Sequence, residues 1–444
     1  MPNQLHREKL LSLFEENQDG LIYLRGAETM YRYNTDYEIP FRQESNFWYL
    51  TGIGEPDYHT VIVIKTGEYF LFCPKRDAQY AVWHGRIKQQ DEIQELYQPD
   101  HLHFDQELLT VLNNLNPSLI YCLDESQAEY LEDLNRDFVV DTETLTDALT
   151  YCRSIKTENE LEKMRTAAKI NNSAHLEVMK AIKPGMFEYQ TKAIYDYFQK
   201  RNGLLQPAYS GIHASGENSA ILHYTGSDRL IADGELFLID AGFEYEGYAS
   251  DVTRTYPVKG RFSGDQAAIY QIVLDALNKT IEMVKPGVNM EDLHLAACQI
   301  ILNGLKQIGI VKGEVHEMME NNVFALFFPH GLGHFLGLDT HDVGGYPKGV
   351  DRIDRPGIRF LRVRRELEAG MVVTIEPGIY FIPALLKPAI NSGEYARFLN
   401  ADRIESLYHF GGIRIEDNLI VTETGYENLT DVPKEILEIE DVMK

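Results

Sequence analysis

The chain has 444 residues, of which 44% are hydrophobic and 11% aromatic. This length exceeds what one hydrophobic core usually organises, so we expect a globular protein of two domains and not a disordered one. Lysine and arginine number 42 against 68 aspartates and glutamates, for a formal charge of −26. Such a charge repels nucleic acid and anionic lipid headgroups, so neither is an expected partner.

The sequence carries no mark of export or membrane insertion. Its first 20 residues lack the apolar segment of a signal peptide, and no apolar run reaches the roughly 18 residues that a membrane span requires. The four cysteines, Cys73, Cys122, Cys152 and Cys298, are far apart and show no Cys-x-x-Cys spacing. We therefore expect a cytoplasmic protein with buried thiols.

Short apolar segments alternate with helical stretches up to about residue 150, which is typical of an α/β layer. Strands are predicted at GLIYLRG (20–26), NFWYLTG (46–52), TVIVIKTG (60–67), EYFLFCP (68–74) and SLIYCLD (118–124), and a helix at DQELLTVLNNL (105–115). The interpretation is an amino-terminal α/β domain of residues 1–155.

The remaining residues, 156–444, contain the same local pattern twice. Thr157-Glu158-Asn159-Glu160 is a capping box that opens a long amphipathic helix; Lys-Pro-Gly (183–185) and a second helix follow it. Ser263-Gly264-Asp265-Gln266 opens another long helix, which again leads to Lys-Pro-Gly (285–287) and a further helix. The repetition predicts an α+β domain with pseudo-twofold symmetry.

Two aspartates flank a predicted β-hairpin formed by LFLIDAG (236–242) and YASDVTR (248–254). If its turn centres on Tyr245 and Glu246, Asp240 and Asp251 lie directly opposite each other with Cβ atoms about 5 Å apart. Like charges this close require a cation or a shared proton between them. The alternative is that one aspartate caps the turn and the other is solvated.

Two glutamates have similar surroundings. Glu376 ends the apolar strand MVVTI (371–375), and Glu416 lies in the strand-like GIRIED (412–417). Four carboxylates with a histidine make an oxygen-rich ligand set, which favours a pair of divalent ions such as Mn²⁺ over a structural zinc.

A group of histidines supplies candidate nitrogen ligands. His330, His334 and His341 lie in FFPHGLGHFLGLDTHDVGG (327–345), and His223 lies in AILHY (220–224). Glycines within the first segment permit a tight, non-helical backbone that aims His330 and His334 into one pocket. A single histidine among apolar residues is more often a core or surface residue than a ligand, and this alternative stays open.

Together these motifs resemble those of the X-Pro peptidases, the family of aminopeptidase P and prolidase, whose catalytic domain has the pita-bread fold. The motifs are IDAG (239–242), HGLGH (330–334), HDVG (341–344), IEPG (375–378) and IRIED (413–417), and FRQESNFWYLTG (41–52) is similar to the family's amino-terminal domain. The resemblance covers nearly the whole chain. It implies that two divalent metal ions, expected to be Mn²⁺, are held by Asp240, Asp251, His334, Glu376 and Glu416.

The resemblance also implies individual roles. Asp240 would be bidentate to one metal, Asp251 and Glu416 would bridge both, and His334 and Glu376 would complete the ligand shells. Lining the substrate site would be His223, His330 and His341, with Tyr209 and Arg414 behind the ligands. Trp83 is similar to a family tryptophan that reaches into the partner subunit's site, which implies a homodimer.

The expected reaction is hydrolysis of an X-Pro bond by a hydroxide that bridges the two ions. Glu376 would accept the water proton and deliver it to the proline nitrogen, and His223 or His330 would stabilise the oxyanion. The bond before proline is a tertiary amide without an N–H, which a site can recognise by shape. Phe327, Phe328 and Leu332 are either walls for the proline ring or core residues.

A basic insert between His341 and Glu376 bears on substrate length. Its cations are Lys348, Arg352, Arg355, Arg359, Arg362, Arg364 and Arg365. An arginine that binds the carboxylate of a dipeptide would reject longer peptides. GGYP (344–347) followed by LRVRR (361–365) resembles prolidase, in which the first arginine of the run, here Arg362, holds that carboxylate.

Three alternatives stay open. The insert is a solvated basic loop; the enzyme is an aminopeptidase P that acts on longer peptides; or the chain is a non-catalytic binding protein that keeps the pita-bread fold. The preferred interpretation is an X-Pro dipeptidase.

Overall fold

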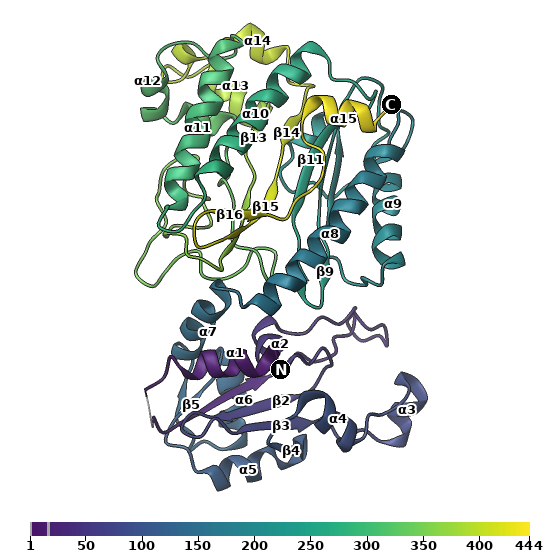
Figure 1. Cartoon of the computed structure of the whole chain (residues 1–444), viewed down its shortest axis with the longest axis vertical. Helices are drawn as coiled ribbons and strands as arrows, with labels where there is room; N and C mark the ends of the chain where they lie inside the picture. Colours follow the sequence, from purple (N-terminus) through teal and green to yellow (C-terminus); the bar gives the residue numbers. More distant parts are fainter. Residues whose placement is uncertain (1, 16–17) are drawn as a thin grey trace. The chain divides into compact units, whose positions relative to one another are not determined.

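The computed structural model describes residues 2–15 and 18–444, and the chain divides into two compact units, Met1–Arg153 and Ser154–Lys444 (Figure 1). The boundary expected from the sequence, between residues 155 and 156, differs from this division by two residues. Of the helices in the described residues, none has both the length and the apolar character that crossing a membrane requires.

The first unit is built on a mixed six-stranded sheet with the strand order β4-β3-β2-β1-β5-β6. The strands are β1 (Leu21–Arg25), β2 (His59–Val63), β3 (Tyr69–Cys73), β4 (His101–Phe104), β5 (Ile120–Tyr121) and β6 (Val140–Asp141). Strands β1, β2 and β3 are antiparallel neighbours, whereas β4, β5 and β6 each join in parallel. The parallel pairs require helical crossovers, which agrees with the predicted α/β character.

Helices connect these strands, and the central strands are buried on both faces. They are α1 (Pro2–Leu11), α2 (Ser45–Thr51), α3 (Ala78–His84), α4 (Gln90–Tyr97), α5 (Leu108–Leu115), α6 (Glu125–Leu134) and α7 (Thr144–Ser154). Leu108 and Leu112 of α5 and Leu131 of α6 pack with Tyr23 and Phe72 of the sheet into one core. Hydrophobic burial in this core stabilises the unit.

The strand predicted at NFWYLTG is wrong, because this segment forms α2. The Glu44 carboxylate accepts hydrogen bonds from the backbone N–H groups of Asn46 (3.0 Å) and Phe47 (2.7 Å) and so caps the helix. Gly52 ends it with a left-handed φ of 72°. The aromatic composition is typical of a strand, but the capping carboxylate precedes the segment and favours the helix.

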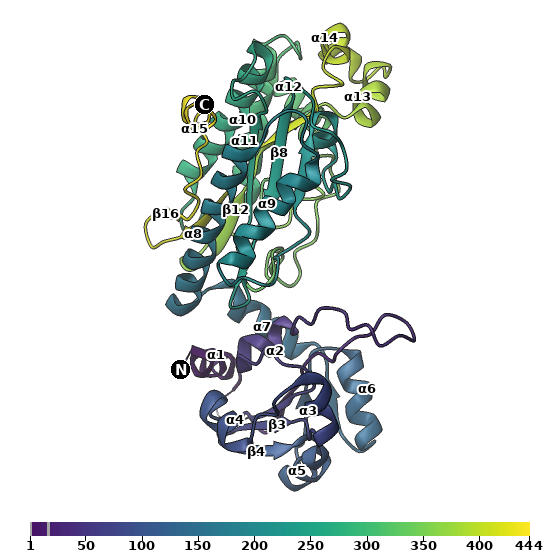
Figure 2. The ribbon, with the colours of Figure 1, turned by 90° about the vertical axis from the view of Figure 1, so that its right-hand side faces the viewer.

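The second unit contains two pairs of long helices. These are α8 (Glu158–Ala181) with α9 (Glu188–Arg201), and α10 (Gly264–Met283) with α11 (Met290–Gln307). Figures 1 and 2 show α8, α10 and α11 running alongside the strands of this unit, and α10 and α11 pack against each other. Shorter helices are α12 (Val315–Glu320), α13 (Pro383–Ile390), α14 (Ala401–Glu405) and α15 (Ile436–Val442).

The strands of this unit form small antiparallel sheets. After the first helix pair come β7 (Ile212–Ser215), β8 (Leu236–Ala241), β9 (Glu244–Tyr245), β10 (Tyr248–Ala249) and β11 (Val252–Pro257). After the second pair come β12 (Val372–Ile375), β13 (Gly378–Tyr380), β14 (Gly412–Arg414), β15 (Asp417–Val421) and β16 (Tyr426–Asn428). The sheet orders are β11-β8-β7, β12-β15-β16 and β13-β14, with β9 and β10 paired as a hairpin tip.

The pseudo-twofold repetition extends to single hydrogen bonds. Gly185 N–H donates to the carbonyl of Ile231 (2.9 Å), and Gly287 N–H donates to the carbonyl of Leu367 (2.8 Å). In each half, the next strand, β8 or β12, begins five residues after that acceptor. Counted from the starts of these strands, Asp240 and Glu376 hold the same position. The predicted symmetry is therefore confirmed, and it brings carboxylates from both halves to corresponding strand ends.

The two halves meet where β11 lies beside residues 414–418. Glu416 N–H donates to the Thr253 carbonyl (3.0 Å), and the Thr255 hydroxyl donates to the Arg414 carbonyl (2.9 Å). The completely buried Arg254 guanidinium pairs with the equally buried Asp417 (2.8 Å) and also donates to the Glu416 carbonyl (2.8 Å). This buried ion pair fixes the register of the two halves directly behind Glu416.

We predict that Arg254→Met destabilises the second unit by about 3–5 kcal/mol, because it leaves the Asp417 carboxylate buried without its main counter-ion. Lys434 also bonds Asp417 (2.6 Å) but is partly exposed. The midpoint of urea or thermal unfolding measures the loss. Lys259→Met is the control, since Lys259 pairs with Asp233 on the surface and its loss costs about 1 kcal/mol or less. Equal effects of the two substitutions would contradict the structural role of the buried pair.

Candidate active site

A cavity of about 610 Å³ in the second unit gathers nearly all of the predicted site residues. Its lining includes the five expected ligands Asp240, Asp251, His334, Glu376 and Glu416. It also includes Tyr209, His223, His330, His341, Arg362 and Arg414. Side chains that lie up to 207 positions apart in the sequence thus face one enclosed space.

The hairpin that carries the two aspartates has a different register from the predicted one. Its turn centres on Glu246 and Gly247, both with positive φ (48° and 83°), instead of on Tyr245 and Glu246. Gly247 favours this turn because it adopts positive φ without steric cost. Asp240 therefore pairs with Thr253 and not with Asp251, so the predicted direct opposition is wrong. The two aspartates lie diagonally and still face the same cavity.

Asp240 is held by two donors. Arg414 contacts its Oδ2 through Nη2 (2.5 Å), and the Tyr209 hydroxyl lies 2.6 Å from its Oδ1. The same hydroxyl is 2.5 Å from Asp251 Oδ1, so its single proton serves one aspartate at a time. Burial acts to raise the pKa of Asp240, but the Arg414 charge and the hydrogen bonds from Tyr209 and Arg414 together hold this pKa below its ordinary value.

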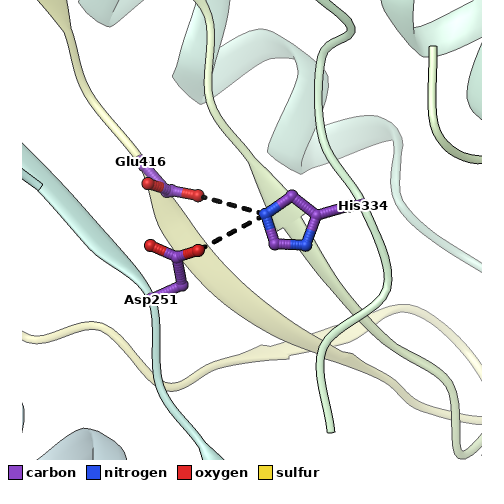
Figure 3. Close-up of side chains that lie close together, drawn as sticks. All are labelled: Asp251, His334 and Glu416. Carbon is purple, nitrogen blue, oxygen red and sulfur yellow. Dashed lines mark ion pairs between the residues drawn. The ribbon is translucent and has the colours of Figure 1, made fainter. Parts of the chain in front are cut away.

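Asp251, His334 and Glu416 form the tightest cluster. One ligand atom from each lies within 4.8 Å of the others, and all three residues are buried. Figure 3 shows both carboxyl groups directed at the same imidazole nitrogen. His334 Nε2 is 3.4 Å from Asp251 Oδ2 and 3.9 Å from Glu416 Oε1. Glu376 Oε1 lies 3.9 Å from the same nitrogen, which adds a fourth donor to the group.

His334 owes its position to a close approach of two backbone segments. Thr374 N–H donates to the His334 carbonyl (2.9 Å), and Glu376 N–H donates to the Leu332 carbonyl (2.7 Å). A Cβ atom on Gly333 would lie 1.9 Å from the Thr374 carbonyl oxygen, so only glycine fits there. His334 Nδ1–H donates to the Phe335 carbonyl (2.9 Å), which leaves Nε2 free to face the carboxylates.

Burial and mutual repulsion shift the carboxyl groups strongly. Burial, followed by the charge of Asp240, raises the pKa of Asp251. Burial, followed by Asp251, raises the pKa of Glu416 well above its ordinary value, and burial raises the pKa of Glu376 to about 7. Burial acts to lower the pKa of His334, but Asp251 and Glu376, with the Phe335 carbonyl, together raise it above its ordinary value. In the absence of a cation, this cluster therefore binds protons that ordinary carboxylates would lose.

The donor set fits divalent metal ions. Glu416 Oε1 is buried without a hydrogen-bond donor, whereas its Oε2 accepts from the Thr253 hydroxyl (2.6 Å). A buried carboxylate oxygen that lacks a donor and faces an imidazole nitrogen is suited to a cation. Oxygen donors with one imidazole match manganese or another borderline ion better than a structural zinc.

His330 is fixed by a chain of hydrogen bonds that sequence reasoning missed. Its Nδ1–H donates to the Gly331 carbonyl (2.8 Å), so Nε2 accepts from the Tyr380 hydroxyl (2.9 Å). Tyr380 in turn accepts from Arg414 Nη1 (2.8 Å). Burial, followed by the Arg414 charge, lowers the pKa of His330 to about 3, so the ring is neutral.

The other two histidines differ in exposure. His341 packs edge-on against the His334 ring with 4.5 Å between centroids, and burial lowers its pKa to about 3. His223 lies on an exposed turn after β7, with Leu222 and Thr225 beside it in the cavity lining.

Most arginines of the basic insert bond to oxygen atoms of the protein itself. Arg352, Arg355, Arg359, Arg364 and Arg365 each bond to neighbouring carbonyl, amide or carboxylate oxygens. Of the insert's cations in the described chain, Arg362 alone lines the cavity. The solvated-loop alternative thus fits the exposed Arg352 and Arg359, whereas Arg355 and Arg364 are partly buried and bond Met319 and Glu291. The hypothesis of a carboxylate-binding arginine narrows to Arg362.

The structure decides between the two alternatives for the apolar residues around His330. Phe327, Phe328 and Leu332 are fully buried in the main hydrophobic core and are not part of the cavity lining, so the core alternative holds. The apolar lining comes instead from Ala208, Ile212, Leu222, Pro329 and Phe360.

Trp83 belongs to the first unit, whereas the cavity-lining residues belong to the second. It lies on α3 of the first unit, and 75% of its surface is exposed. The role that the resemblance implies for it stays a prediction.

Two neutral side chains near the ligands had no distinctive sequence signal. Thr253 bonds Glu416, and Asn418 accepts from Asp251 N–H (2.9 Å) while its amide donates to the Asp251 carbonyl. Their proximity to the motifs DVTR and IRIED was visible, but their partners lie more than 160 residues away.

Comparisons with known proteins agree with this architecture. Residues 162–423 match the model of metallopeptidase family M24, and residues 4–121 match the amino-terminal domain of aminopeptidase P. The Xaa-Pro dipeptidase of Rattus norvegicus is 41% identical over 99% of this chain and 92% of its own length.

Solved structures give the same result. The Pseudomonas aeruginosa aminopeptidase PepP superimposes with a TM-score of 0.85 at 34% identity, covering 99% of this chain and 97% of that one. Escherichia coli aminopeptidase P, solved with the inhibitor Pro-Leu, gives 0.86 at 33% identity, covering 100% and 97%.

The fold and the acidic cavity define a metal-dependent hydrolase with a pita-bread catalytic unit. The chain belongs to metallopeptidase family M24. It is therefore an enzyme, and the non-catalytic alternative is set aside.

Because the pKa values of Asp251, Glu376 and Glu416 are raised, we predict that divalent cations displace protons on binding at pH 7. A carboxyl whose pKa is raised keeps its proton at a pH where an ordinary carboxyl is ionised, and the cation binds the ionised form. Calorimetric titration with Mn²⁺ in two buffers of different ionisation enthalpy measures the protons released. Glu416→Gln should release fewer, and a heat of binding that is independent of the buffer would contradict the prediction.

Proposed function

We propose that the protein is an Mn²⁺-dependent Xaa-Pro dipeptidase that hydrolyses the bond before a carboxyl-terminal proline. The observation that carries the proposal is the position of Arg362, an exposed guanidinium in the same cavity as the buried acidic cluster. An exposed guanidinium in the cavity lining suits a substrate whose free carboxylate lies close to the scissile bond. The similarity to the Rattus norvegicus Xaa-Pro dipeptidase supports this substrate class.

Two divalent ions would be held by Asp240, Asp251, His334, Glu376 and Glu416. When bound, such ions polarise a carbonyl group and lower the pKa of water. Glu376, whose pKa burial raises to about 7, is suited to accept a proton from the attacking water and pass it to the proline nitrogen. Its position at the end of β12 keeps the carboxylate inside the cavity.

The three histidines of the cavity that are not expected ligands would have different roles. Both nitrogens of His330 are engaged with Gly331 and Tyr380, so its ring supports the cavity wall in this arrangement. His223 is the better oxyanion donor of the two because it lines the cavity from an exposed turn. His341, neutral and packed on His334, would contact substrate beside it.

Arg414 would act through Asp240 and Tyr380, both of which it bonds. The Tyr209 hydroxyl contacts both Asp240 and Asp251, so Tyr209 would set the spacing of these two aspartates. These two residues therefore hold the ligand carboxylates at the geometry that the cations require.

We also propose a cytoplasmic homodimer. The largely exposed Trp83 lies near a run of exposed residues, 31–40, that includes Tyr31, Tyr33 and Tyr37, and aromatic side chains of this kind favour an interface. All four cysteines are buried, which suits a reducing compartment. Analytical ultracentrifugation of the wild type and Trp83→Ala tests the dimer.

A direct assay separates the two peptidase candidates. Protein stripped with a chelator should release no proline from Gly-Pro, and addition of Mn²⁺ should restore the release. The structural similarity to Escherichia coli aminopeptidase P favours the second candidate, an aminopeptidase that acts on longer chains. Rapid cleavage of Xaa-Pro tripeptides with no cleavage of Gly-Pro would establish that candidate instead.

Replacing Arg362 tests the carboxylate contact. We expect Arg362→Met to raise KM for Gly-Pro by roughly 10- to 100-fold, the range for a lost charge-assisted hydrogen bond. Arg359→Met is the matched control, because Arg359 belongs to the same insert but pairs with Asp354 at the surface. An unchanged KM in Arg362→Met would exclude the contact.

A further inference from the structure

Glu188 is a buried carboxylate outside the cavity that the proposed reaction does not use. It is the first residue of α9 and has no solvent exposure. Its Oε1 accepts from Ser215 N–H (2.7 Å), the Ser215 hydroxyl (2.7 Å) and the Asn218 amide (3.2 Å). Its Oε2 accepts from the Tyr224 hydroxyl (2.7 Å) and from Arg229 N–H (3.2 Å).

These five donors all come from residues 215–229, which are the last residue of β7 and the loop that follows it, and they lie on both sides of His223. Ser215 and Asn218 precede His223, whereas Tyr224 and Arg229 follow it. The loop contains only the short 3-10 turn Gly216–Ala220, so little regular secondary structure fixes its course. One carboxylate thus gathers the loop from both ends.

The Arg229 guanidinium pairs with Glu235 and not with Glu188. Arg229 Nη1 and Nη2 bond Glu235 at 2.6 and 2.5 Å, and Nη1 also donates to the Ser215 hydroxyl (2.8 Å). The Glu188 carboxylate is therefore held mainly by neutral donors and by the amino-terminal end of α9. A side chain that carries a donor in its place would face N–H groups that cannot accept.

The loop forms part of the cavity wall. Leu222, His223 and Thr225 line the cavity, and Tyr224, between two of them, bonds Glu188. The Asn218 amide also donates to the Tyr224 hydroxyl (2.9 Å), so that hydroxyl directs its own proton to Glu188. Burial and the Glu188 carboxylate raise the pKa of Tyr224 to about 12, which keeps this proton in place.

We propose that Glu188 is a positioning residue that, through Tyr224, holds the His223 loop against the substrate cavity. The proposal rests on the proposed function for the role of His223, but the hold on the loop does not. A small displacement of a group that stabilises developing charge lowers kcat more than it changes KM.

The first experiment measures the loop itself. Chymotrypsin should cut after Tyr224 about tenfold faster, or more, in Glu188→Gln than in the wild type, because loss of a charge-assisted hydrogen bond increases opening of the loop. The control is Glu427→Gln. Glu427 lies on β16, accepts two hydrogen bonds from Arg165 of α8 and does not line the cavity. Equal cutting rates in the wild type and Glu188→Gln would overturn the proposal, whatever the substrate of the enzyme.

The second experiment is a double-mutant cycle with Gly-Pro as substrate. We expect Glu188→Gln to lower kcat by roughly 10- to 100-fold with little change in KM, and the double variant with His223→Ala to be no slower than His223→Ala alone. Multiplied losses would show that Glu188 acts independently of His223 and would overturn the proposal.

A milder variant guards against misfolding. Tyr224→Phe removes one donor and should give a smaller loss of kcat that is likewise absent in the His223→Ala background. If the wild-type enzyme releases no proline from Gly-Pro, the proposed function fails, and the proteolysis comparison still decides the role of Glu188.

Discussion

Repulsion between carboxylates in a poorly solvated cavity is the constraint around which the second unit is built. Asp240, Asp251, Glu376 and Glu416 approach one another from two halves of the chain, and the raised pKa values of three of them express the cost. Only a structure held rigidly behind these groups keeps them together. The buried Arg254–Asp417 pair and the hydrogen bonds between β11 and residues 414–418 provide that rigidity.

The carboxylates of the cluster differ in whether the protein neutralises them. Asp240 has a fixed counter-ion in Arg414, whereas Glu416 keeps one buried oxygen without a donor. The unit therefore does not neutralise all of its carboxylates internally. It leaves a deficit of positive charge that divalent ions are suited to fill, and it fixes the imidazole of His334 so that its ligand nitrogen faces the same point.

Much of this arrangement could be predicted from the sequence. Charged residues that end apolar strands are unusual enough to identify Asp240, Glu376 and Glu416, and the repeated capping boxes predicted α8 and α10. Two errors have physical causes. The capping carboxylate of Glu44 made a helix of an aromatic segment, and a one-residue shift of the turn at Gly247 changed the register of Asp251.

Other features were beyond sequence reasoning because their meaning depends on distant partners. Tyr380 and Thr253 are neutral residues whose roles follow from contacts with His330, Arg414 and Glu416. Within the insert, spacing alone did not distinguish Arg362 from the other arginines, and only the motif resemblance indicated it. Such choices are made by tertiary packing and not by local pattern.

The matched bonds of Gly185 and Gly287 have a consequence for how the second unit could be divided. Each bond closes a helix pair onto the strands of its own half, so the chain can be split near Gly260 without cutting either closure. The leading fragment would carry Asp240 and Asp251, and the trailing fragment would carry His334, Glu376 and Glu416. Neither fragment has a complete set of ligands, so a bound divalent cation would favour the association of two separately expressed fragments.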